Sequence, residues 1–182
     1  MAFHLFRTTE VAKDLAAGGV SPREQASYLV VSFLAWSVPF YLYLIPSPAA
    51  QDPTFLGWMW MIEAVLVIVV FVIGVNYCLR RCRVDPRRHF LIDFSCLYAP
   101  VAVTTSIVIW GLFHLVVTLP MWMAARGASR LGALPWVSSA NVYDVVRLAF
   151  YVAAILVIFW RVGAHMERIS ALRSSAPGAR GR

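Results

Sequence analysis

Charged side chains are scarce in this sequence, and their scarcity argues against most classes of soluble protein. Aspartate, glutamate, lysine and arginine make up 14% of the 182 residues, whereas hydrophobic residues make up 60% and the mean hydropathy is +0.71. Soluble domains contain about 25% charged residues. The composition therefore predicts an integral membrane protein. Four membrane spans with their loops would use nearly the whole chain, so we expect no separate soluble domain.

Lysine is almost absent, because fifteen arginines and a single lysine, Lys13, supply the basic side of the net charge of +7. A basic excess can indicate nucleic-acid binding, but such binding needs a basic face on a folded soluble module. In a membrane protein the same excess orients the chain and contacts anionic lipid headgroups. No nucleic-acid partner is therefore predicted. The preference for arginine over lysine is typical of GC-rich bacterial genomes, which favours a bacterial cytoplasmic (inner) membrane.

The three cysteines are too few, and wrongly spaced, for the chemistry that cysteine usually supports. Cys78 and Cys82 lie one helical turn apart, with His89 and Cys96 further along the chain. This spacing matches no standard zinc ribbon or finger, so no metal site is predicted. The cysteines are expected near the cytoplasmic side, where thiols stay reduced. The expected outer loops contain no cysteine, which excludes a four-span quinone-linked thiol oxidase.

Histidine and the common catalytic motifs are also scarce. A b-type haem needs axial ligands from facing helices, and His114 is the only histidine within an expected span, so no cofactor is predicted. The sequence contains no P-loop and no G-x-S-x-G, H-E-x-x-H or G-x-G-x-x-G motif. An enzyme is therefore less expected than a protein without catalytic activity.

An arginine-rich connection lies between two long apolar runs in the middle of the chain. This basic hinge contains Arg80, Arg81, Arg83, Arg87 and Arg88. Such a loop is typical of the cytoplasmic side, because moving arginine across the bilayer is costly. Three basic residues precede the first expected span and five follow the last, whereas only two lie in an expected outer loop. Both termini are therefore predicted to be cytoplasmic.

Four apolar runs predict an all-α integral membrane protein built as a bundle of four transmembrane helices. The expected spans are residues 27–45, 55–79, 91–119 and 142–160, within a membrane domain of residues 27–163. Residues 164–182 form a basic, polar tail that we expect to be disordered. The polar residues before the first run include acidic side chains, which favours a retained span over a cleaved signal peptide.

Residues 1–26 predict a short amphipathic helix on the cytoplasmic side, followed by the start of the first span. The apolar stripe of this helix is narrow, with Val11 and Leu15 one turn apart, and Gly18-Gly19 should end it. We interpret it as lying against lipid headgroups or against the basic hinge, with partner binding as the alternative. The sequence Ser21-Pro-Arg-Glu24 then predicts a helix start with a capping box.

Ionisable residues inside the expected spans form one candidate site near the outer face of the membrane. Counting from the outer ends places four of them at similar depth: Glu63, His114, Asp144 and Arg147. Because ionisable groups are costly in hydrocarbon, they should face one another. The favoured interpretation is an interhelical clamp in which Glu63 pairs with Arg147 and Asp144 caps its own helix. The alternative is a polar chamber in which Glu63 and His114 pass protons.

Asp93 is the remaining ionisable residue near a span end. We expect it to cap the third span or to pair with arginines of the basic hinge. These features together predict a non-enzymatic accessory or scaffold component of a membrane complex. A small proton-linked transporter or an oligomeric channel using Glu63, His114 and Arg147 is the alternative. The expected partners are the lipid bilayer, anionic headgroups, and either another membrane protein or a second copy of the chain.

Overall fold

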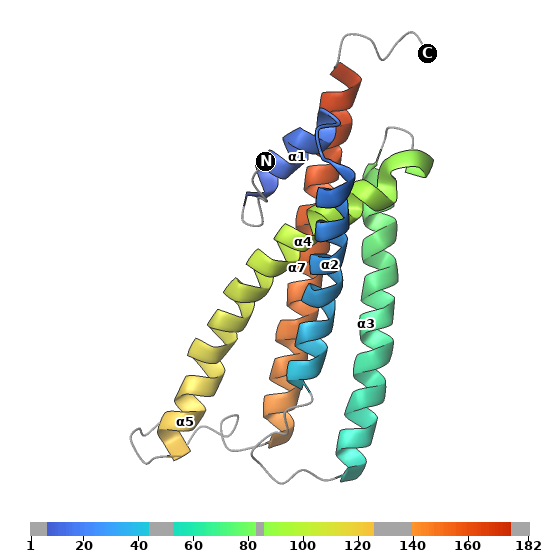
Figure 1. The fold of residues 1–182 in the computed structure, drawn as a ribbon. Helices are drawn as coiled ribbons and strands as arrows, with labels where there is room; N and C mark the ends of the chain where they lie inside the picture. The colour runs from blue at the N-terminus through green and yellow to red at the C-terminus, as the bar shows by residue number, and fades with distance from the viewer. Residues whose placement is uncertain (1–6, 44–52, 83–85, 126–139, 176–182) are drawn as a thin grey trace.

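The protein is all-helical in a computed structural model that describes residues 7–43, 53–82, 86–125 and 140–175 (Figure 1). These residues contain no β-strand. The helices are α1 (Thr8–Ala16), α2 (Pro22–Tyr43), α3 (Pro53–Arg81), α4 (Pro86–Phe113), the π-helix η1 (His114–Thr118), α5 (Leu119–Ala125) and α7 (Ala140–Ser175). Helix α4, η1 and α5 follow one another without a break.

Three stretches of the described chain are long and apolar enough to cross a membrane. They are Met61–Arg81 in α3, Phe90–Met123 in α4 to α5, and Val142–Ser174 in α7. Their positions agree with the second, third and fourth spans expected from the sequence. The fold is therefore all-α with three candidate membrane-spanning helices, which indicates a membrane protein. Part of the first expected span lies outside the described residues.

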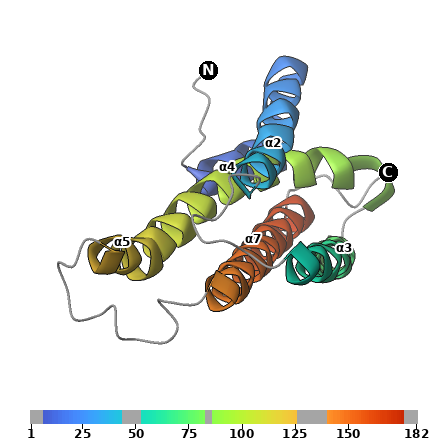
Figure 2. The same cartoon turned by 90° about the horizontal axis from the view of Figure 1, so that it is seen from below.

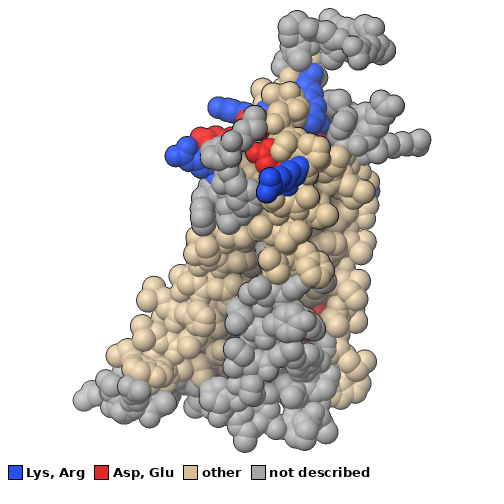
Figure 3. Space-filling view, viewed as in Figure 1, with Lys and Arg blue, Asp and Glu red and all other residues tan. Residues whose placement is uncertain are grey.

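Helix α7 is the central element of the arrangement. Helix α3 packs along one side of it and α4 along another, while α2 packs on α4 (Figures 1 and 2). Helices α3 and α7 run in the same direction, and α4 runs opposite to both (Figure 1). Helix α1 lies across α7 and α4 at the end of the bundle where α7 finishes. On the face shown in Figure 3, the described charged side chains gather mainly at that end, above a long surface with few charged side chains.

The contact between α3 and α7 depends on two glycines. A β-carbon added at Gly74 would overlap the ring of Phe159, and one added at Gly163 would overlap the ring of Tyr77. The Phe159 ring also packs edge-on against Phe71, with ring centres 5.3 Å apart. Small residues at these positions let two helices approach closely, as is common between helices in membranes. The two glycines therefore set the distance between α3 and α7.

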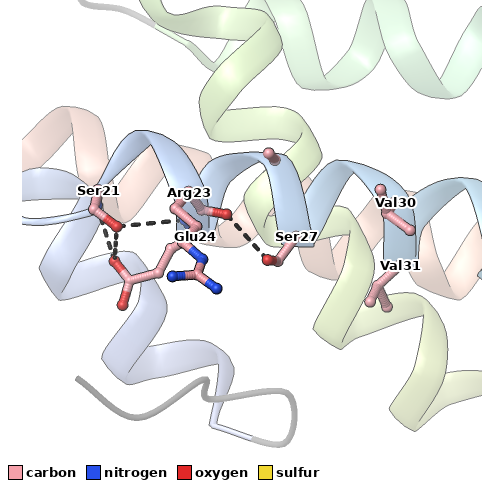
Figure 4. Close-up of a pocket in the computed structure, with 7 residues that line it drawn as sticks. Ser21, Arg23, Glu24, Ser27, Val30 and Val31 are labelled. Atoms are coloured by element: carbon pink, nitrogen blue, oxygen red, sulfur yellow. Dashed lines mark hydrogen bonds between the residues drawn. The ribbon is translucent and has the colours of Figure 1, made fainter.

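The expected start of α2 is confirmed by its hydrogen bonds. The backbone N–H and the hydroxyl of Ser21 both donate to Oε2 of Glu24, at 2.9 and 2.8 Å, and the Glu24 N–H lies 3.4 Å from the Ser21 hydroxyl oxygen (Figure 4). This is the reciprocal geometry of a capping box. The cap forms one end of an open hollow that continues along α2 to Val31 (Figure 4).

Helix α1 also ends where the sequence indicated. Gly18 has a φ of +69°, and the N–H groups of Gly18 and Gly19 donate to the carbonyls of Leu15 and Asp14 at 3.2 and 2.8 Å. A left-handed glycine of this kind is a common helix terminator. The apolar stripe of α1, including Val11 and Leu15, is buried against α7 and α4. The stripe is therefore covered by α7 and α4 of the same chain.

Helix α7 continues to Ser175, so the expectation of a disordered tail is wrong for residues 164–175. Met166 and Ile169 extend the buried face of α7 beyond the expected span and belong to the same core as Val11 and Leu15 of α1. Their helical spacing presents one apolar face to α1. Burial of that face outweighs the polar composition of the segment. Residues 176–182 lie outside the described residues.

Candidate functional site

An ion pair lies at the start of α7, within the candidate site expected near the outer face. Nη2 of Arg147 is 3.1 Å from Oδ1 of Asp144, one turn earlier on the same helix. The pair is largely buried, with side-chain exposures of 12% for Arg147 and 3% for Asp144. Asp144 lies in the second turn of α7, which begins at Ala140, and its capping role stays a prediction. Its ion pair with Arg147 neutralises two charges that would be costly in hydrocarbon.

Glu63 lies on α3, half-buried, on the side that faces α7. The register of these parallel helices is fixed by contacts between residues 81 and 86 positions apart, Cys78 with Phe159 and Arg81 with Glu167. Glu63 and Arg147 are 84 positions apart, so this register places them at the same level. The Glu63 carboxylate is also close enough to Tyr151, one turn beyond Arg147, to interact with it electrostatically. A direct pairing of Glu63 with Arg147 stays a prediction.

His114 is placed apart from this group. It lies in the π-helix, exposed, with its Nδ1 3.1 Å from the hydroxyl oxygen of Thr118 on the next turn. The neighbouring Phe113 packs against Tyr143 and Phe150 of α7, with ring centres 5.7 and 5.3 Å apart. At this end of the bundle α5 and α3 lie on opposite sides of α7 (Figure 2). The described structure thus places Glu63 of α3 at the level of the pair formed by Asp144 and Arg147 on α7. It does not place His114 with Glu63 in one chamber.

The basic hinge is described in part. Nη1 of Arg81 is 2.6 Å from Oε2 of Glu167 in α7, and the Arg81 guanidinium stacks over the ring of Tyr77 at 4.7 Å. Arg80 is exposed at the same end of α3. Arg83 lies outside the described residues, and for Arg87 and Arg88 only the backbone, in the first turn of α4, is described. The described part of the hinge therefore joins α3 to α7 by one ion pair.

Asp93 pairs with Arg173, which corrects the expectation of a partner in the basic hinge. Nη1 and Nη2 of Arg173 lie 2.6 and 3.1 Å from the two carboxylate oxygens of Asp93, and Nη2 also donates to the carbonyl of Leu15 at 2.9 Å. Asp93 is only 2% exposed. One guanidinium thus ties together α1, α4 and α7. The sequence signal for this clamp was the apolar spacing that extends α7 beyond residue 163 and carries Arg173 to the level of Asp93.

A second polar contact between α4 and α7 was missing from the sequence-based expectations. Nη1 of Arg161 donates to the hydroxyl oxygens of Thr105 and Thr104, at 3.1 and 3.4 Å. The Thr104 hydroxyl also lies 2.8 Å from the carbonyl oxygen of Pro100, one turn earlier. Arg161 was expected only to mark the cytoplasmic end of the last span. In the structure its side chain is half-buried between two helices.

The three cysteines, Cys78, Cys82 and Cys96, are buried, and none of them is in a disulfide. The Cys78 thiol lies 3.6 Å from the carbonyl oxygen of Phe159, which is part of the packing between α3 and α7. Within the described residues, no group of three or more histidine, cysteine, aspartate or glutamate side chains could hold a metal ion. These cysteines therefore serve the core as small apolar side chains.

No family model, no curated protein and no solved structure matches this chain. A function for it therefore has to come from its own contacts and surfaces. Ion pairs occur near both ends of the bundle. They join one helix to another or one turn of a helix to the next.

Proposed function

We propose that this protein is a non-enzymatic accessory or scaffold component of a membrane complex in a bacterial inner membrane. In this proposal α2 joins α3, α4 and α7 as a fourth membrane span, and both termini are cytoplasmic. Support for α2 comes from its described apolar residues, since Leu29, Val30, Phe33 and Leu34 are all more than half exposed. Support for the orientation comes from the basic hinge and the basic segments at both ends of the chain.

The observation that carries the proposal is the uncovered apolar face of α3. Helix α3 packs against α7 on one side and exposes large apolar side chains along the other, at Met61, Ile62, Val65, Ile68, Val69, Val72 and Ile73. These positions recur every three to four residues and so form one continuous face. A face of this kind suits lipid and the apolar helix of a neighbouring membrane protein. The ionisable groups behind it are engaged within the chain, which suits a scaffold better than a transport path.

The alternative function, a proton-linked transporter or an oligomeric channel, draws its support from Glu63. A half-buried carboxylate inside a candidate span is expensive and marks many proton pathways. However, its level on α3 matches that of Arg147 and Tyr151, whereas His114 lies in the π-helix that follows α4. The clamp interpretation is therefore favoured for Glu63.

The proposal is tested by extracting the tagged protein from host membranes directly into lipid nanodiscs and measuring the mass of what accompanies it. We expect a second membrane protein in fixed stoichiometry. The matched variants are Ile68→Trp, on the uncovered face of α3, and Ile107→Trp, on an exposed face of α4. Ile68→Trp should lose the partner while Ile107→Trp keeps it. A monomer or a homo-oligomer alone would contradict the scaffold function and favour proton-flux measurements.

A further inference from the structure

Arg161 lies at the depth where the inner end of the hydrocarbon layer should fall. Helix α7 has 36 residues and is therefore about 54 Å long, whereas the hydrocarbon layer is about 30 Å thick and needs about 20 residues. Counting about 20 residues from Ala140 reaches Trp160 and Arg161. Trp160 is 63% exposed, as is usual for a tryptophan at a membrane interface. Arg161 is also six residues, about 9 Å, deeper than the bridge between Glu167 and Arg81.

The contacts of Arg161 leave its charge unbalanced. In the part of the chain that the structure describes, no carboxylate pairs with Arg161, and its hydrogen bonds go to the neutral hydroxyls of Thr104 and Thr105. Those bonds use one guanidinium nitrogen, so further N–H groups remain on the half-buried side chain. The exposed Arg168, two turns along α7, adds positive charge nearby and likewise pairs with no described carboxylate. A cation at the edge of hydrocarbon is stabilised by an anion.

His165 supplies a second, independent observation. It lies one turn beyond Arg161 on the same side of α7 and is only 9% exposed. Its Nδ1 is buried and has no hydrogen-bond partner among the described residues. Arg161 and Arg168 are both close enough to His165 to act on it electrostatically. Arg161, His165 and Arg168 thus gather three basic side chains within two turns of α7, and none of them pairs with a described carboxylate.

We propose that Arg161, positioned by its hydrogen bonds to Thr104 and Thr105, binds the phosphate of an anionic phospholipid. The proposal rests on the membrane insertion and orientation proposed above, which place this site at the cytoplasmic leaflet. The guanidinium of Arg161 suits phosphate oxygens, because two N–H groups can donate in parallel. The positive charges of Arg161 and Arg168 together favour a lipid with net negative charge over a zwitterionic one. Trp160 lies beside the site at headgroup level.

The test is a lipid titration of the purified full-length protein in detergent, with bound lipids counted by native mass spectrometry. The probes are phosphatidylglycerol, phosphatidylcholine and inorganic phosphate. We expect the native protein to retain one phosphatidylglycerol in preference to phosphatidylcholine, and Arg161→Gln to bind it about tenfold more weakly. The matched control is Arg23→Gln, which removes the same charge from an exposed position at the start of α2 and should change binding less than about threefold.

A second variant keeps the proposal falsifiable if Arg161→Gln does not fold. Thr105→Val preserves the shape of the buried side chain and removes only the hydroxyl, so it should fold and bind phosphatidylglycerol several-fold more weakly. Equal binding by the native protein, Arg161→Gln and Thr105→Val would overturn the lipid site. If inorganic phosphate occupies the site as fully as phosphatidylglycerol does, the ligand is free phosphate and the lipid proposal is overturned. Recovery of the protein in the soluble fraction of lysed cells would instead overturn the membrane function on which the site rests.

Discussion

Arg173 donates hydrogen bonds to both carboxylate oxygens of Asp93, at 2.6 and 3.1 Å, although the two residues are 80 positions apart in sequence. The same guanidinium donates to the carbonyl of Leu15, so one side chain near the end of α7 holds the end of α1 and the start of α4. A guanidinium that binds both oxygens of a carboxylate restricts geometry more than a single hydrogen bond does. This clamp fixes the arrangement of three helices at the end of the bundle where charged side chains gather.

Removing the cation from this clamp should be strongly destabilising. The Asp93 side chain is 3% exposed and that of Arg173 is 20% exposed, so Arg173→Gln would leave a buried carboxylate without its partner. We expect a loss of about 3 kcal/mol in the free energy of unfolding, measured by denaturant titration in detergent. The double variant Asp93→Asn with Arg173→Gln should lose less than the two single variants combined, because no buried charge remains. Additive losses would show that the two residues act independently.

The control for that prediction is the ion pair between Arg81 and Glu167. Its distance is also 2.6 Å, but its side chains are 38% and 47% exposed, so solvent screens the attraction. Glu167→Gln should therefore change the free energy of unfolding by less than about 1 kcal/mol. If Glu167→Gln and Arg173→Gln cost the same, burial would not be the reason for the strength of the Asp93 clamp.

Adding one methyl group at either close contact between α3 and α7 should separate the helices. Gly74→Ala and Gly163→Ala would place a β-carbon against the rings of Phe159 and Tyr77, and the Phe159 ring is itself packed against Phe71. We expect each to lower the free energy of unfolding by about 1 to 3 kcal/mol in the same titration. Gly111→Ala is the matched control, since nothing lies within 4 Å of its added β-carbon. Alanine there should stabilise α4 by up to about 1 kcal/mol.

Substitution of Glu63 separates the clamp from the proton pathway. Glu63→Gln keeps the shape of the side chain but removes the charge that acts on α7. If Glu63 is a clamp, the variant loses about 1 kcal/mol of stability, and proteoliposomes of native and variant protein show the same background proton flux. A pH-driven flux in the native protein that Glu63→Gln abolishes, with stability unchanged, would support the transporter instead.

Much of the fold follows from local sequence, because its signals act over a few residues. The apolar runs that became α3, α4 and α7 are long enough to be recognised without knowledge of their neighbours. The capping box joins Ser21 and Glu24, which are only three residues apart, and the left-handed Gly18 depends only on its own conformation. These elements could therefore be predicted, and the structure confirms them.

The polar contacts between helices were predicted less well, because they depend on register. Arg173 was assigned to a disordered tail, and its pairing with Asp93 requires that α7 extend far beyond the apolar run. The contact of Arg161 with Thr105 requires the antiparallel alignment of α4 and α7. Depth alone grouped His114 with Glu63, but depth does not say which side of α7 each faces. A sequence gives the position of each residue along its helix, whereas these contacts also depend on how neighbouring helices are rotated and aligned against one another.

The central claim is that α2 crosses the membrane as a fourth span, which leaves both termini in the cytoplasm. The native cysteines are buried, with exposures of 0%, 7% and 0% for Cys78, Cys82 and Cys96, so a cysteine added elsewhere can be labelled selectively. The direct measurement is labelling of Lys13→Cys and Gln51→Cys with a membrane-impermeant maleimide in bacterial spheroplasts. The account predicts that Gln51→Cys reacts in intact spheroplasts and that Lys13→Cys reacts only after lysis. Labelling of both positions only after lysis would contradict it.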